Sequence, residues 1–194
     1  MRLPISAHTS RPWRIHEVAP DFEVESVWAL RTPGGAEEFP RLVSQLASDN
    51  WPDGAPYIVR FLWELRWRLG AWFGWDRAGS GVGSRVRSLR HRLPVDLRDA
   101  PQGPEYDPFV SVYQLENEWA AELANRTVHT VIHLAWVPDG SGGYQGQMTS
   151  LVKPNGMYGR GYMTAIKPFR YLIVYPVLVR RIEREWRATV PRNP

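Results

Sequence analysis

The clearest pattern of apolar and polar positions lies in the second half of the chain, where the two kinds alternate. Residues 127–137 carry β-branched and aromatic side chains at alternating positions, which predicts a strand. Aspartate and glycine residues crowd 139–143 and predict a tight hairpin turn, so 144–152 is expected to be the returning strand. A weaker alternation over 109–115 predicts another strand. Together these segments predict an antiparallel meander.

A period of three to four residues follows the meander and predicts a long helix over 157–187. Its apolar stripe consists of Leu172, Tyr175, Val179, Ile182 and Trp186. Pro168 and Pro176 are expected to kink or split this helix, because proline removes a backbone donor and crowds the preceding turn.

The first half of the chain has shorter and less regular elements. We expect a strand over 13–18, a short helix from Asp21 through Leu30, a helix over 36–47 and a clearer amphipathic helix over 58–73. Residues 1–12 contain two prolines and are expected to form a loosely ordered arm. Glycines and prolines interrupt residues 76–107, which are expected to form an irregular loop.

This order of elements predicts an α+β protein with a single domain over 1–194. An antiparallel meander that ends in a long amphipathic helix is the layout of a helix-grip, in which a curved antiparallel sheet wraps around the C-terminal helix. The elements of the first half add extra N-terminal helices. The space between sheet and helix is then the expected cavity.

Composition narrows the class of protein. The chain has no cysteine, which excludes disulfides, thiolate nucleophiles and cysteine metal sites. The N-terminus lacks an apolar signal region, and no run of about eighteen apolar residues is present, so we expect a cytoplasmic protein that does not bind a membrane. The net charge of +4 is too small to indicate binding to nucleic acid.

Several short motifs resemble a bacterial family of unknown function, DUF2867. They are 124–129, 133–134, 136–139, 153–156, 166–170 and 174–176, with 83–86, 92–94 and 96–98 upstream. The family is similar to the START and polyketide-cyclase-like (SRPBCC) helix-grip proteins. The resemblance implies a cavity for an apolar small molecule and no particular reaction. The sequence has no Gly-x-Gly-x-x-Gly motif after a strand, so no dinucleotide and no other cofactor is expected.

Four ionisable side chains form the first candidate site: Glu118, Glu122, His129 and His133. If 125–126 is a two-residue turn, Glu122 lies opposite His129 and Glu118 lies opposite His133, on one face of the sheet. The alternative for 119–123 is one turn of helix. A carboxylate beside an imidazole suits general acid–base catalysis, and Glu122 and His129 are the candidate catalytic residues. Alternatively, both pairs are salt bridges on the solvent face. No metal site is expected, because residues four apart on a strand lie ~13 Å apart.

A second group surrounds the end of the sheet and the final helix. In a helix-grip, five of its members are candidate ligand-binding residues: Trp136, Lys153, Arg170, Tyr171 and Tyr175. Lysine is rare in this chain, and a desolvated Lys153 or Lys167 can act as a nucleophile or base. The alternative for both lysines is helix-end capping and surface pairing.

A third group consists of the arginines between 85 and 98, which can clamp an anionic headgroup or a phosphate. The alternative is a solvated loop whose charge is balanced by Asp96 and Asp99.

Three functions are consistent with these features. The first is binding of a small hydrophobic or aromatic metabolite in a cavity between the sheet and the C-terminal helix. The second is cofactor-free cyclisation, dehydration or isomerisation of a polyketide-like intermediate in the same cavity. The third is a non-catalytic interaction module, with a filled interior and an aromatic surface that forms a homodimer.

Overall fold

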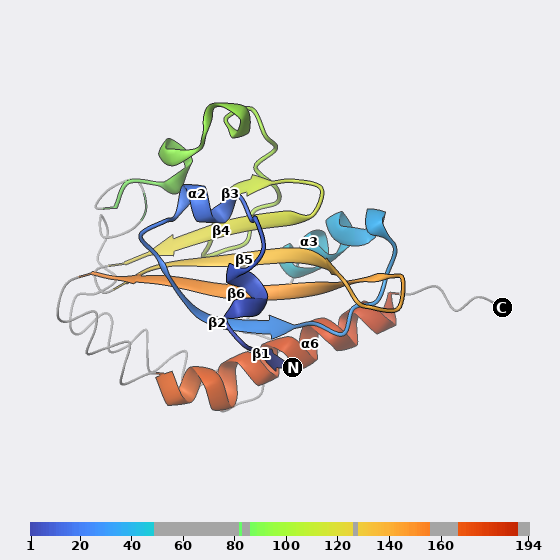
Figure 1. Ribbon diagram of the computed structural model, residues 1–194. Helices are drawn as coiled ribbons and strands as arrows, with labels where there is room; N and C mark the ends of the chain where they lie inside the picture. The colour runs from blue at the N-terminus through green and yellow to red at the C-terminus, as the bar shows by residue number, and fades with distance from the viewer. Residues whose placement is uncertain (49–81, 83–85, 126–127, 156–166, 190–194) are drawn as a thin grey trace.

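The computed structural model describes residues 1–48, 82, 86–125, 128–155 and 167–189 (Figure 1). The strands are β1 (Arg2–Leu3), β2 (Glu23–Ala29), β3 (Val110–Gln114), β4 (Glu118–Ala124), β5 (Val128–Pro138) and β6 (Tyr144–Pro154). The helices are α1 (Ser6–Thr9), α2 (Ile15–Val18), α3 (Phe39–Ala47) and α6 (Tyr175–Ala188). Single 3-10 turns cover Ala36–Glu38, Leu89–Arg92 and Val95–Leu97.

The six strands form one antiparallel sheet in the order β1-β2-β6-β5-β4-β3. The predicted strands in the second half are confirmed, and β5 and β6 pair along their whole length. The turn between them is closed by Asp139, whose Oδ1 accepts from the backbone N–H groups of Ser141 and Gly143. Gly140 and Gly142 both have positive φ in this turn, which explains the glycines there.

The predicted C-terminal helix is confirmed over its described part, where residues 167–188 are continuously helical. The helix is not split at Pro176, which lies in the first turn of α6. A widened π-helical stretch, Arg170–Val174, directly precedes α6. Such a stretch makes room where a proline ring crowds the turn before it. Among the described residues, none of the helices has the length and apolarity needed to cross a bilayer.

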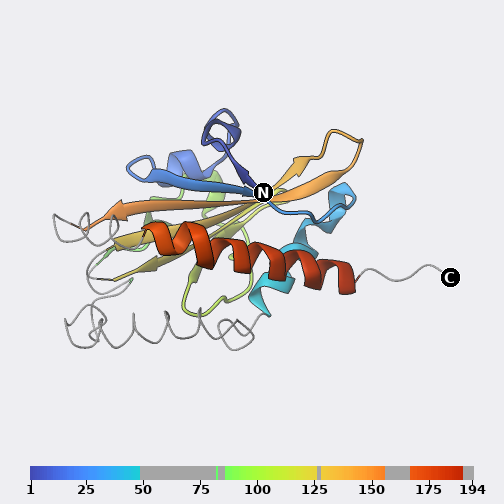
Figure 2. The ribbon, with the colours of Figure 1, turned by 90° about the horizontal axis from the view of Figure 1, so that it is seen from below.

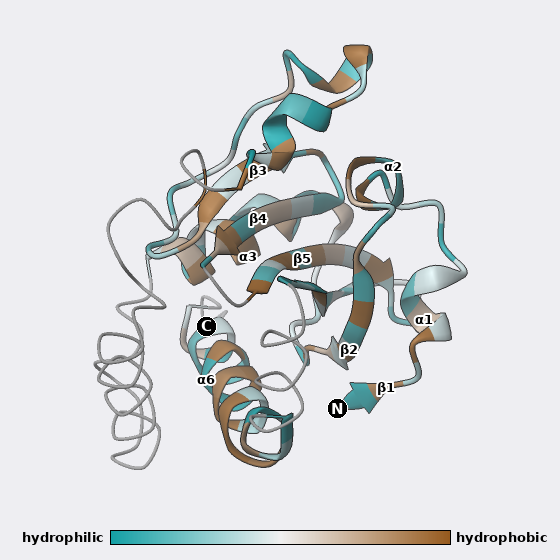
Figure 3. Cartoon of the chain, turned by 90° about the vertical axis from the view of Figure 1, so that its left-hand side faces the viewer, coloured by the Kyte–Doolittle hydropathy of each residue, from teal (hydrophilic) through white to brown (hydrophobic). Residues whose placement is uncertain are grey.

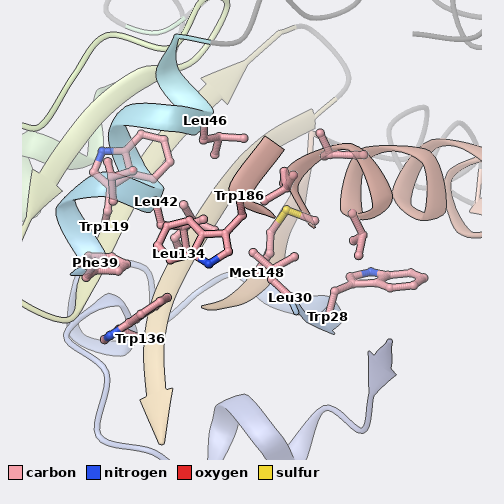
Figure 4. Close-up of a cluster of buried hydrophobic side chains, with 14 of the residues drawn as sticks. Trp28, Leu30, Phe39, Leu42, Leu46, Trp119, Leu134, Trp136, Met148 and Trp186 are labelled. Carbon is pink, nitrogen blue, oxygen red and sulfur yellow. The ribbon is translucent and has the colours of Figure 1, made fainter. Parts of the chain in front are cut away.

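One core lies between the sheet and the helices α3 and α6, which cover the same sheet face (Figures 2 and 3). Leu134 and Trp136 of β5 and Met148 of β6 pack there against Ile182 and Trp186 of α6. Figure 4 shows this cluster, with the indole of Trp186 beside Trp136 and Leu134. Four members of the apolar stripe predicted for the helix, Tyr175, Val179, Ile182 and Trp186, therefore face the sheet, whereas the fifth, Leu172, is exposed.

A second core lies on the opposite sheet face, which Figure 3 shows on the side of α1 and α2. Ile15 and Val18 of α2 pack in this core with Val131 of β5. Leu89, which begins the 3-10 turn Leu89–Arg92, and Leu93, which directly follows that turn, belong to the same core. The N-terminal segment and residues 86–97 thus form a third layer. Both faces of the sheet are buried at its centre.

Several expectations for the first half were wrong. Residues 15–18 are helical, because one helical turn lets Ile15 and Val18 both point to the sheet. Residues 23–29 form β2 instead of a helix, and the pairing with β6 outweighs the weak local pattern. Residues 1–12, expected as a loose arm, contain β1 and α1.

The helix expected over 36–47 is confirmed as a 3-10 turn followed by α3. The helix expected over 58–73 lies outside the described residues, and within 76–107 the described part contains the other two 3-10 turns.

Candidate functional site

The four ionisable residues of the first candidate site share one face of the sheet, as expected, but the register is shifted. His129 is paired with Ala124, and Glu122 is paired with Val131. The predicted turn at 125–126 is therefore wrong: the backbone N–H of Asn125 donates to the carbonyl of Val128. A shift of two residues keeps every side chain on its face, so each carboxylate meets its histidine diagonally.

All four side chains are buried beneath the third layer, and the alternative of a solvent-exposed face does not hold. Glu122 has no exposed surface (0%), and its Oε2 lies 2.8 Å from Nε2 of His129. The same carboxylate accepts hydrogen bonds from the hydroxyl of Ser88 and the backbone N–H of Leu89. The ring of Phe22 covers His129 edge-on, at 4.8 Å between ring centroids. Glu122 thus fastens the segment 86–97 to the sheet.

The second pair, Glu118 and His133, belongs to a longer network. Oε2 of Glu118 accepts from Nε2 of His133 at 2.9 Å and from the hydroxyl of Tyr113 at 3.0 Å. Oε1 of Glu118 accepts from the backbone N–H of Arg14 at 3.0 Å. On its other side, Nδ1 of His133 lies 3.2 Å from Nε2 of His8. The N-terminal segment is therefore fastened to the sheet through a second buried carboxylate.

Burial and hydrogen bonding shift the pKa values of three groups in this network. Burial opposes ionisation of Glu118, yet the hydrogen bonds from His133, Arg14 and Tyr113 hold its pKa below the ordinary value. Burial, followed by repulsion from His133 and His16, lowers the pKa of His8 to about 3. Burial, with the neighbouring charge of Glu118, raises the pKa of Tyr113. The network therefore contains an ionised Glu118, a neutral His8 and a protonated phenol at neutral pH.

A hollow of about 450 Å³ opens on the surface next to this network. We call it the N-terminal pocket; its walls are formed by Ile5, Thr9, His16, Ala19, Pro20, Phe22, Glu23, Val24 and Leu151. The ring of His16 contacts the ring of His8 edge-on, at 4.9 Å between centroids. His16 thus connects the wall of the N-terminal pocket to the buried His8–His133–Glu118 network.

The residues expected to line a cavity between the sheet and the C-terminal helix have other contacts. Trp136 is buried in the first core, packs against Trp186 and donates from Nε1 to the carbonyl of Gly35. Lys153 pairs with Asp21 at 2.6 Å on the surface, and Arg92 pairs with the same carboxylate. The surface-pairing alternative describes Lys153.

Arg170, Tyr171 and Tyr175 come together around Glu25. Arg170 pairs with the carboxylate of Glu25 at 2.8 Å, and the hydroxyl of Tyr171 donates to the backbone carbonyl of Glu25. The hydroxyl of Tyr175 lies 3.3 Å from Oε2 of Glu25. Lys167 lies over the ring of Tyr171, with its Nζ 5.8 Å from the ring centroid. This cluster ties the beginning of the C-terminal helix to β2.

The structure describes residues 87–98 of the expected anion-binding loop, with the arginines that they contain. Arg92 has an acidic partner, Asp21, and Asp96 pairs with Arg14 rather than with an arginine of the loop. Within the described residues, no group of three histidine or acidic side chains is placed to hold a metal ion.

His8, His16 and Tyr113 were not among the candidate residues expected from the sequence. Histidine is scarce, with five in the chain, and three of the five converge at this network. The scarcity of histidine was a usable signal, but its spacing was not, because His8 lies 125 residues from His133 in sequence.

The comparisons with known proteins identify the family of this chain and nothing further. No curated protein and no solved structure matches the chain. A family model described as "Protein of unknown function (DUF2867)" matches residues 18–177. This match spans most of the chain and includes β2 through the first turn of α6. The chain therefore belongs to the DUF2867 family.

Proposed function

We propose that this chain is a START-like (SRPBCC) binding protein for a small, mainly apolar molecule, and that the molecule occupies the N-terminal pocket. The observation that carries the proposal is the composition of this pocket. Six of its nine wall residues are apolar, and Thr9, His16 and Glu23 are the polar ones. Binding sites for small molecules have this character: a concave apolar surface of about 300–1,000 Å³ with a few polar groups that orient the ligand.

Among the described residues, the space between the sheet and α6 is less suited to hold a ligand. Trp119, Trp136 and Trp186 fill it, together with aliphatic side chains from α3 and α6 (Figure 4). Another hollow lies on the outer surface of α6, where Arg181, Arg184, Glu185 and Ala188 surround it. Neither observation favours a ligand under the helix.

The superfamily assignment is supported by architecture alone. A six-stranded antiparallel sheet with a long C-terminal helix across one face is the helix-grip layout. In this proposal the ligand lies on the opposite face from the helix. Glu122 and His129 then have a positioning role, because their polar atoms already bind Ser88, Leu89 and each other.

The test compares two substitutions that add the same indole. Val24→Trp places it in the wall of the N-terminal pocket, and Val110→Trp places it on the exposed surface of β3, away from the pocket. Native mass spectrometry would compare the native and denatured masses of each protein, and calorimetry would measure binding of methoxynaphthalene as an apolar probe. We expect a bound small molecule, and probe binding, in the wild type and in Val110→Trp but not in Val24→Trp. Equal probe binding by both variants would contradict the proposed site.

A further inference from the structure

The C-terminal helix has an outward side as well as a buried one. It lies across one face of the sheet, and the side opposite to its buried stripe faces away from the sheet (Figure 2). The long side chains exposed there are those of Lys167, Phe169, Leu172, Arg180, Arg184 and Arg187. From Phe169 onward these residues follow one another at spacings of three, four or eight, and residues at such spacings share one side of a helix. We call this set the outer helix face.

Two members of the outer helix face are large and apolar. Phe169 is 51% exposed, and Leu172, at 78%, is the most exposed large apolar side chain among the described residues. They are one turn apart, so their exposed surfaces adjoin. Their neighbour Tyr171 points elsewhere, because its hydroxyl donates to the backbone carbonyl of Glu25. Adjoining apolar side chains with a polar rim are typical of a surface that a partner covers.

The other members of the outer helix face are cationic, and the helix itself does not neutralise them. Residues 167–189 contain two carboxylates. Glu183 is buried and accepts from the backbone N–H of Arg31, and Glu185 pairs with Arg181 at 2.9 Å. Among the described residues, no carboxylate pairs with Lys167 or with the three arginines of the outer helix face. The face is therefore positively charged at both of its ends.

The combination of charge and apolar surface decides which kind of partner fits. A second copy of the same face is disfavoured, because its cations would repel these. A nucleic acid would use the arginines but would leave Leu172 exposed. The surface of an anionic bilayer uses both kinds of side chain: cations contact the phosphates, and bulky apolar side chains enter the boundary of the acyl chains. The hollow of about 360 Å³ beside Arg181 and Arg184 adds a recess for a phosphate, whose oxygens a guanidinium group binds in pairs.

We propose that the outer helix face binds the surface of a bilayer that contains anionic phospholipids, with the helix lying in the plane of the headgroups. The expectation that the protein binds no membrane came from the absence of an apolar run long enough to span one. Binding at the surface needs no such run, because only one side of the helix enters the lipid. The proposal is independent of the N-terminal pocket, which lies on the other face of the sheet.

The experiment measures co-sedimentation of the full chain with two kinds of vesicle: an equal mixture of phosphatidylglycerol and phosphatidylcholine, and phosphatidylcholine alone. Binding to the anionic vesicles should be at least about tenfold stronger, and most of it should be lost when the salt concentration rises from about 0.05 M to about 0.5 M. Absence of binding to the anionic vesicles at the lower salt concentration would overturn the proposal.

The role of the charges is tested by two double variants that each lower the net charge of +4 by two. Arg180→Gln with Arg184→Gln changes the outer helix face, whereas Arg87→Gln with Arg98→Gln changes exposed positions in and next to the third layer, on the other side of the sheet. The first should bind the anionic vesicles about 25-fold more weakly than the wild type, at about fivefold per charge, and the second less than about twofold more weakly. Equal losses would show that net charge alone governs binding, which would overturn the assigned face.

The role of the apolar side chains is tested by Leu172→Ser, with Val95→Ser as the control at a similarly exposed position of the third layer (78% and 75%). Leu172→Ser should weaken binding to the anionic vesicles about tenfold, and Val95→Ser less than about twofold. Both side chains are exposed, so near-ultraviolet circular dichroism should show an unchanged fold. Full binding by Leu172→Ser would overturn the bilayer as the partner, and tight binding of the wild type to soluble polyglutamate would then assign the face to an acidic protein.

Discussion

Glu122 and His129 lie diagonally across β4 and β5, and their side chains meet at 2.8 Å although neither residue is the other's partner in the strand pairing. The backbone partner of His129 is Ala124, and that of Glu122 is Val131. The diagonal leaves one oxygen of Glu122 free to reach Ser88 and Leu89 in the covering segment. One buried carboxylate thereby joins two strands and the third layer.

Removal of this carboxylate should destabilise the protein strongly. In Glu122→Ala, the imidazole of His129 and the backbone N–H of Leu89 lose their buried acceptor, so we expect the free energy of unfolding to fall by about 3–5 kcal/mol. Glu122→Gln keeps one acceptor oxygen and should cost about 1–3 kcal/mol. Urea unfolding measures both. Glu105→Gln, at an exposed carboxylate, should change stability by less than about 0.5 kcal/mol, and an equally small effect at Glu122 would contradict the anchoring role.

His8 should make stability depend on pH in the mildly acidic range. Burial, with repulsion from His133 and His16, lowers its pKa from 6.5 to about 3 in the folded protein, so the unfolded chain binds a proton more readily. The stability that neutral His8 contributes is complete above the unfolded pKa of 6.5 and is lost as the pH falls toward 3. His8 contributes at most about 1.4 kcal/mol per pH unit to the slope of the free energy of unfolding against pH.

Urea unfolding across this range should show that the free energy of unfolding depends less on pH in His8→Gln than in the wild type. His91→Gln should follow the wild type, and identical slopes in all three proteins would show that His8 titrates normally.

Replacing single side chains on the C-terminal helix with alanine should reveal which face of the helix is buried. Ile182 is 1% exposed and packs in the first core, so Ile182→Ala should lower the free energy of unfolding by about 2–5 kcal/mol through the lost side chain and the cavity it leaves. Leu172 is 78% exposed on the same helix, and Leu172→Ala should cost less than about 0.5 kcal/mol. Thermal or urea unfolding of the two variants makes the comparison. A larger loss at Leu172 would mean that the helix is rotated from the orientation described.

Gly103 should tolerate a side chain poorly for two reasons, and Gly140 for one. Both have positive φ, at 86° and 83°, where a side chain costs about 1–2 kcal/mol. A Cβ at Gly103 would also lie 2.7 Å from Nε1 of Trp119, whereas a Cβ at Gly140 would meet nothing within 4 Å. Gly103→Ala should therefore be the more destabilising by about 1–3 kcal/mol in urea unfolding. It should also alter the near-ultraviolet signal of the buried Trp119, and Gly140→Ala should not.

The strands β5 and β6 and the amphipathic helix could be predicted because their patterns are long and regular. The alternation of β5 and the apolar stripe on α6 each indicate a buried face, and burial of that face stabilises the strand and the helix. The first half gave weaker predictions. Residues 15–18 and 23–29 are short, and their secondary structure depends on what they pack against, namely the sheet face and the edge of β6.

The sequence by itself indicated that Glu118 and Glu122 share one face of their strand and that His129 and His133 share one face of theirs, because a strand has a period of two. The expected register was wrong by two residues, and an even shift keeps both pairs on the same face of the sheet. Only the tertiary structure decided that this face is buried, since the covering residues come from 13–22 and 88–97, and no local pattern links those segments to the sheet. The same holds for the partner of His133, because His8 is brought to it by the packing of the N-terminal segment. Side-chain periodicity is a local property of the backbone, whereas the choice of a covering layer depends on which distant apolar surfaces fit together.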